Sequence, residues 1–175
     1  SLGVLHLINQ AIGYINKNGY ISNPPDLPDD NEPIFDKNMK FNMRLAALLH
    51  DVGHCPFSHM GETQLDALDV KDALSAEINN PDFKFSENFK NHITTKEPKK
   101  IGAIHEQLSC IMVLDHYYDR FDKINSDFAN KFNLNIDLEF IFRSILGIKY
   151  EVITKEDYVK YRIKNIAIEL LNSKI

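Results

Sequence analysis

The sequence has little basic charge and no long apolar run. Its 25 acidic residues outnumber the 20 basic residues and leave a net charge of -5, whereas proteins that bind nucleic acid broadly need a basic face. No apolar stretch approaches the ~20 residues that cross a bilayer, and no charged region followed by an apolar core opens the chain. We therefore expect no membrane partner, and the charge disfavours nucleic acid as a partner.

Cysteine is scarce as well. Cys55 and Cys110 are the two cysteines of the chain, and their spacing fits neither a disulfide framework nor a paired-cysteine metal site. Such usage is typical of proteins in a reducing compartment. We therefore expect a cytoplasmic protein.

Alternation of apolar and polar residues, which predicts β-strands, is rare in this chain. Apolar residues instead recur at steps of three and four, as on one face of a helix. A hydrophobic content of 43% is sufficient for a packed core in a chain of 175 residues. These features predict an all-α fold in a single domain spanning residues 1–175. The segments with helical periodicity are 4–15, 39–50, 105–112, 138–146 and 159–170.

Two regions interrupt this helical pattern. Residues 22–33 hold four prolines, which cannot continue a helix and favour turns, so we expect a loop there. The stretch from about 66 to 103 is polar and weakly periodic. It predicts an irregular insertion that contains no more than one short helix.

Polar residues and a glycine predict where helices begin and end. Asp36 is placed to cap a helix that runs to His50, and Gly53 is placed to end it. His50 and Asp51 are therefore expected at the C-terminal end of that helix. Thr154 is placed to cap the final helix.

Residues 50–62 contain three of the seven histidines. Adjacent His50 and Asp51 offer an imidazole nitrogen and a carboxylate oxygen to one cation, although an isolated pair of this kind is structural in roughly nine cases of ten. Gly53 and the following proline predict a rigid turn. This turn would present His54 and the next histidine, His59, to the same pocket.

A second pair in this segment predicts acid-base chemistry. His59 and Glu62 are three residues apart, a spacing at which helical side chains touch. A carboxylate in that place orients an imidazole and raises its proton affinity. We interpret His59 and Glu62 as a catalytic dyad.

The whole string from His50 to Glu62 resembles the HD superfamily, in particular its deoxynucleoside triphosphate triphosphohydrolase branch, which is dGTPase-like. The resemblance extends to residues 1–4 and 169–173 and to the segment His105-Glu106-Gln107. It implies an HD-domain helical bundle that splits a deoxynucleoside triphosphate (dNTP) into deoxynucleoside and triphosphate. It also covers most of the chain.

The resemblance implies a role for each matching residue. His50 and Asp51 would be ligands of a divalent metal cation, for which Mn, Mg or Fe suit the nitrogen and carboxylate donors and Zn or Ni are alternatives. His54 and His105 would contact the substrate phosphates, and His59 would transfer a proton. We further expect a homo-oligomer in the intact protein.

In the family, the first metal histidine directly precedes the segment that residues 1–4 resemble, and the last metal aspartate follows the segment like 169–173. The resemblance therefore implies a bundle truncated at both ends. We expect such a fragment to bind its cation weakly and to be inactive by itself, because two of four ligands are outside it.

Two alternatives remain open from the sequence. One is another HD-superfamily phosphodiesterase or nucleotidase, because the His50-Asp51 pair is common to all of them, whereas residues 56–59 and 61–62 favour the triphosphohydrolase branch. The other is a non-catalytic helical module that senses nucleotide.

Overall fold

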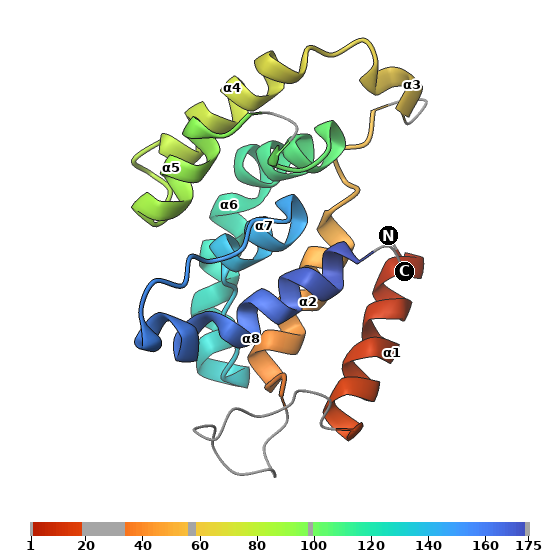
Figure 1. Cartoon of the computed structure of the whole chain (residues 1–175), viewed down its shortest axis with the longest axis vertical. Helices are drawn as coiled ribbons and strands as arrows, with labels where there is room; N and C mark the ends of the chain where they lie inside the picture. The colour runs from red at the N-terminus through yellow and green to blue at the C-terminus, as the bar shows by residue number, and fades with distance from the viewer. Residues whose placement is uncertain (1, 19–33, 56–58, 98–99, 174–175) are drawn as a thin grey trace.

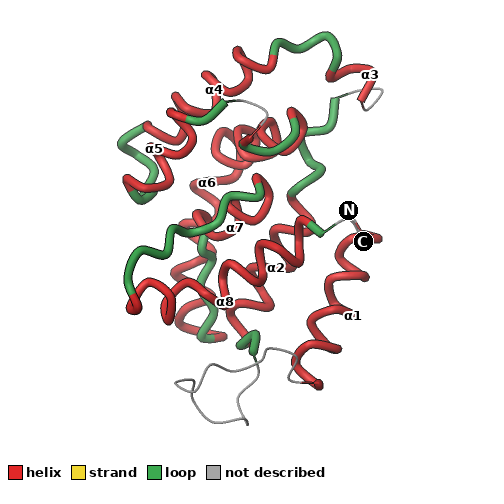
Figure 2. The backbone as a smooth tube through the Cα atoms, in the orientation of Figure 1, coloured by secondary structure: helices red, strands yellow, loops and turns green. Residues whose placement is uncertain are grey.

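A computed structural model describes residues 2–18, 34–55, 59–97 and 100–173. Within these ranges every regular element is a helix and no strand occurs, which confirms the all-α prediction (Figure 2). No helix in the described ranges has the length and apolar character needed to cross a membrane. The helices are α1 (Leu2–Asn18), α2 (Lys37–Leu49), α3 (His59–Glu62), α4 (Ala67–Asn79), α5 (Glu87–Thr95), α6 (Ile104–Phe132), α7 (Leu138–Leu146) and α8 (Lys155–Asn172).

The helix starts follow the predicted caps. Asp36 lies just before α2, and its carboxylate accepts a hydrogen bond of 2.6 Å from the Met39 amide. Thr154 lies just before α8, and its hydroxyl accepts the Asp157 amide at 3.1 Å. Both side chains satisfy amides that have no partner within the helix.

The apolar side chains form two core clusters that meet at α7. One cluster joins α4, α5, α6 and α7, with Leu74, Phe89 and Ile141 among its fully buried members. The other joins α1, α2 and α8, and Phe140 of α7 belongs to it. Helix α7 therefore packs against α2, α6 and α8 (Figure 1).

The prediction of an irregular insertion at about 66–103 is wrong, because this region contains two core helices, α4 and α5. Val70, Leu74 and Ile78 are buried at successive steps of four residues in α4. That stripe is one residue wide and its sequence neighbours are mostly polar, so its helical period is weak in a window average. The predicted loop at 22–33 lies outside the described residues.

The start of α1 and the end of α8 lie near the end of α2 (Figure 1). Val4 of α1, Leu171 and Asn172 of α8 and His50 line one pocket of about 180 Å³. The fold therefore brings both ends of the described chain to the His50-Asp51 pair.

Candidate metal centre

The chain turns tightly after α2 and packs against the start of α6. The Val52 amide donates to the Leu49 carbonyl at 3.2 Å, and the His54 amide donates to the Asp51 carbonyl at the same distance. We call residues 50–54 the HD turn. Helix α2 has already ended at Leu49, with His50 as its C-cap.

Gly53 has a different role from the predicted one, because it lies beyond the end of α2. A Cβ atom at this position would lie 2.3 Å from the Ser109 amide nitrogen and 2.6 Å from the Leu108 carbonyl carbon of α6. No side chain fits at such distances from backbone atoms. Gly53 therefore permits the HD turn to approach α6 closely, and the prediction that it ends the helix is wrong.

Ser109 connects the HD turn to α6 and was missed in the sequence. It is 0% exposed, and its hydroxyl accepts a 2.9 Å hydrogen bond from the Gly53 amide. The same oxygen lies 2.8 Å from the carbonyl oxygens of both His50 and His105. Its spacing of four residues from His105 places both on one helix face, which was the available signal.

The carboxylate of Asp51 lies between two imidazoles. Nε2 of His50 is 3.1 Å from Oδ2, and Nε2 of His54 is 3.4 Å from Oδ1. Nδ1 of His50 lies 2.9 Å from the Ala47 carbonyl oxygen, which can only accept, so Nδ1 carries the proton of a neutral ring. The lone pair of Nε2 then faces a carboxylate oxygen.

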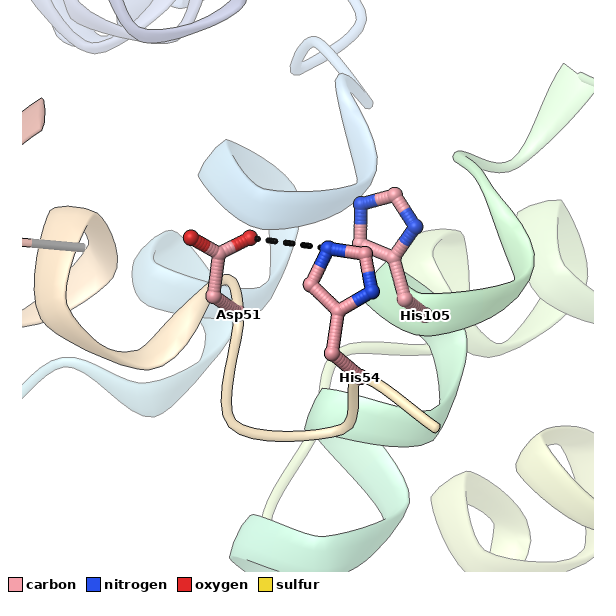
Figure 3. A group of neighbouring side chains, drawn as sticks. All are labelled: Asp51, His54 and His105. Carbon is pink, nitrogen blue, oxygen red and sulfur yellow. Dashed lines mark ion pairs between the residues drawn. The ribbon is translucent and has the colours of Figure 1, made fainter. Parts of the chain in front are cut away.

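The carboxylate of Glu62 also lies between two imidazoles. Its Oε1 is 3.1 Å from Nδ1 of His54 and 3.0 Å from Nδ1 of His105. The His54 and His105 rings stack with their centroids 4.0 Å apart and an interplanar angle of 15° (Figure 3). Glu62 therefore joins residues that are about fifty positions apart in the chain.

The predicted contact between His59 and Glu62 involves a side chain outside the described residues. The backbone of His59 opens α3, whereas its side chain lies outside the described part of the structure. In that described part, Glu62 contacts His54 and His105. The dyad therefore stays a prediction, and the two imidazole contacts are additional to it.

The donors of this cluster suit a divalent cation. One oxygen of Asp51 and one nitrogen each of His54 and His105 lie within 4.8 Å of one another (Figure 3). Metal–ligand bonds of about 2.0–2.2 Å place ligand atoms about 3–4 Å apart, so small side-chain rotations suffice. Both ring nitrogens of His54 also face carboxylates, and a neutral ring supplies only one proton for them. In a neutral ring, one nitrogen therefore directs a lone pair at a carboxylate oxygen. A cation bound between these two atoms would remove their repulsion.

Comparison with known proteins gives the family. The model of the HD domain matches residues 2–124, which include the HD turn, Glu62 and His105. The chain belongs to the HD domain family. Searches of curated proteins and of solved structures each found no match.

Membership in the HD family supports a metal-dependent phosphohydrolase that uses a divalent cation. The metal pair expected from the sequence, His50 and Asp51, is joined by a contact of 3.1 Å between Nε2 and Oδ2. The group of three residues that could hold a metal ion contains Asp51 but not His50. Its other two members are His54 and His105, which the resemblance assigned to phosphate contacts. The individual roles of these residues therefore stay proposals.

The first turn of α6 is stabilised by residues of its own segment. Glu106 accepts a 2.6 Å hydrogen bond from the Ala103 amide, and Gln107, 1% exposed, donates to the Gly102 carbonyl at 3.2 Å. In this HD domain, Glu106 and Gln107 thus fix the helix start that carries His105.

Proposed function

We propose that this HD domain hydrolyses a dNTP to deoxynucleoside and triphosphate. The observation that carries the proposal is the contact of Glu62 with both His54 and His105. It joins the two segments whose sequences resemble the triphosphohydrolase branch. The His50-Asp51 pair, which is common to the superfamily, would not by itself require residues 50–62 to meet the segment that begins at His105.

Asp51 is the central ligand in this proposal, because both candidate ligand sets contain it. His50 completes the pair that the resemblance implies, while His54 and His105 complete the group that lies within 4.8 Å. Mn, Mg or Fe suit these donors, with Zn or Ni as alternatives. Such a cation lowers the pKa of a bound water and neutralises charge on a phosphoryl oxygen.

Glu62 orients the imidazoles toward the substrate in our proposal. Its Oε1 faces Nδ1 of both His54 and His105, so a proton on each Nδ1 is favoured and each Nε2 is left for the opposite side. Nε2 of His54 lies toward Asp51. Where a ring does not ligate the cation and carries a proton on both nitrogens, we assign its Nε2 to donate to a phosphate oxygen.

The bond changes of the proposed reaction are simple. Water adds to the α-phosphorus and loses a proton, the bond from that phosphorus to the 5′ oxygen breaks, and the 5′ oxygen gains a proton. We assign the transfer of this proton to His59, with Glu62 as its partner. Replacement of His59 by alanine should abolish turnover while it leaves the helical fold and most cation binding intact, and near-normal turnover of this variant would contradict the assignment.

Analysis of the reaction products tests the function directly. A dNTP incubated with the protein and Mn²⁺ should yield deoxynucleoside and triphosphate in equal amounts. Monophosphate with pyrophosphate would instead indicate another HD phosphodiesterase or nucleotidase. Saturable binding of the dNTP without any product would indicate a nucleotide-sensing module. Cytoplasmic location and homo-oligomerisation stay predictions beside this proposal.

A further inference from the structure

The Ser109 hydroxyl joins the HD turn to the α6 backbone through hydrogen bonds. It has a single proton, so it accepts from the Gly53 amide and donates to the carbonyl of His50 or of His105. We propose that Ser109 is a positioning residue that sets the distance between the HD turn and His105.

The surroundings of Ser109 indicate a specific role for its hydroxyl. The residue is 0% exposed and is followed in α6 by the buried Cys110. A buried hydroxyl is costly unless it is hydrogen-bonded, and a bond to the carbonyl four residues earlier would satisfy it within the helix. The contacts with Gly53 and His50 are not needed for that purpose. They connect a separate segment.

Gly53 opposes any shift of the turn toward α6. Its backbone is already so close that an added Cβ would lie 2.3 Å from the Ser109 amide nitrogen. The hydrogen bond from its amide to the Ser109 oxygen opposes movement in the other direction. Steric contact and hydrogen bonding thus define one separation.

This separation determines the contacts of the imidazoles. His54 follows Gly53 directly, and His105 is one helical turn before Ser109. Their ring stacking at 4.0 Å and their shared contact with Glu62 both require the observed spacing. A displacement of about 1 Å costs on the order of 100-fold in rate at an active site. This consequence for catalysis rests on the proposed function, whereas the geometry does not.

The substitution Ser109→Ala in the 175-residue chain tests the geometry without any metal or substrate. Nuclear magnetic resonance should show exchange of the Gly53 amide hydrogen accelerated about tenfold, since one buried hydrogen bond is lost. The nuclear Overhauser effect between the His54 and His105 ring protons should weaken. That between Phe85 and Phe142, whose centroids are 5.7 Å apart in the core, should persist.

Two further variants separate positioning from general stability. Cys110→Ala removes the neighbouring core side chain, so it should lower stability and leave the signals of Gly53 and of the two rings unchanged. Ser109→Thr keeps a hydroxyl that can accept from the Gly53 amide and should retain the ring contact. In the intact protein, Ser109→Ala should lower kcat about 100-fold with a smaller change in KM.

A Ser109→Ala chain with wild-type Gly53 protection and an intact ring contact would overturn the proposal. Equal loss of these signals in Cys110→Ala would also overturn it, because general destabilisation would then explain them. If Ser109→Ala fails to fold, Gly53→Ala decides, since its Cβ must separate the turn from α6 and abolish the ring contact. A wild-type protein that shows these contacts but hydrolyses no dNTP would refute the proposed function alone.

Discussion

Two clusters of charged side chains in this protein differ in how their groups are paired. The first contains the HD turn, Glu62 and His105. The second surrounds Arg143 of α7, which is 1% exposed. Each nitrogen of this guanidinium donates to an oxygen: Nε to Glu139 at 2.9 Å, Nη1 to the Lys149 carbonyl at 3.1 Å and Nη2 to Asn88 at 3.0 Å.

Aromatic rings complete the second cluster, which we call the Arg143 cluster. The guanidinium carbon lies 4.8 Å from the ring centroid of Phe89 and 4.3 Å from that of Tyr150. Tyr150 in turn stacks on Tyr161 at 4.6 Å. Burial and nearby carboxylates raise the pKa of Tyr150 well above its usual value, so its hydroxyl stays neutral.

The pairing of polar groups in the Arg143 cluster is suited to stabilising the fold, whereas that in the HD cluster is suited to binding a ligand. In the Arg143 cluster, donors face acceptors. In the HD cluster, ring nitrogens of His50 and His54 lie 3.1 and 3.4 Å from carboxylate oxygens of Asp51, and the side chains of His50, Asp51 and His54 are 23%, 29% and 27% exposed. Complementary pairing stabilises the fold, whereas imidazole nitrogens and carboxylate oxygens gathered within reach of solvent suit a cation.

The largest effect is expected where the structural cluster is broken. Arg143→Ala would leave Glu139 without its ion pair in a half-buried place, and breaking such a pair typically costs about 3–5 kcal/mol. Urea unfolding should show this loss. Arg143→Lys should recover part of it, because a lysine keeps the charge but not the three-way geometry. A variant as stable as wild type would remove the distinction between the clusters.

A smaller and different effect is expected from Asp51→Asn. It removes a carboxylate from the cation ligands, so the affinity for Mn²⁺ should fall by at least about 10- to 100-fold, while the free energy of unfolding changes little. Isothermal calorimetry and urea unfolding measure the two quantities. Asp137→Asn is the matched control, because Asp137 pairs with Lys164 at 2.7 Å. This control should lower stability and not affinity.

The pH dependence of stability tests the Arg143 cluster further. Burial, then Lys96 and then Arg143 lower the pKa of His92 below 6.5, with Glu151 opposing. The unfolded chain therefore binds this proton more readily than the folded chain, so stability falls as the pH drops below 6.5. His92→Gln should reduce this loss of stability, measured by thermal unfolding between pH 7 and pH 5. His116→Gln, at an exposed histidine, should not reduce it.

The smallest effect is expected at the start of α8. Hydrogen bonds from the hydroxyl and the amide of Thr154 lower the pKa of Asp157 below 3.8. The contribution of the Asp157 carboxylate to stability is therefore present above pH 3.8. It is lost as the pH falls through the lower pKa that this group has in the folded chain. Protection of the first α8 amides against hydrogen exchange, relative to the intrinsic rate at each pH, should fall over that acid range. Asp157→Asn should remove this fall, whereas Glu156→Gln in the same turn should not.

Local sequence determined the positions of α1, α2, α7 and α8 and several of their ends. Periodic apolar residues predicted α1, α2, α7 and α8, because burial of one face repeats every three or four residues. Asp36 and Thr154 predicted helix starts, because a cap bonds to amides only two or three residues away. The place of His50 and Asp51 at the end of α2 followed from the same local rules.

The tertiary structure alone decided which distant groups meet. The close packing of Gly53, the bridging hydroxyl of Ser109 and the contact of Glu62 with His105 each join segments separated by more than forty residues, and no local spacing encodes such a contact. Burial of α4 and α5 likewise depends on their packing against each other and on the packing of α4 against α6. Sequence patterns specify what a short segment can form, whereas the partners of its side chains depend on the packing of the whole chain.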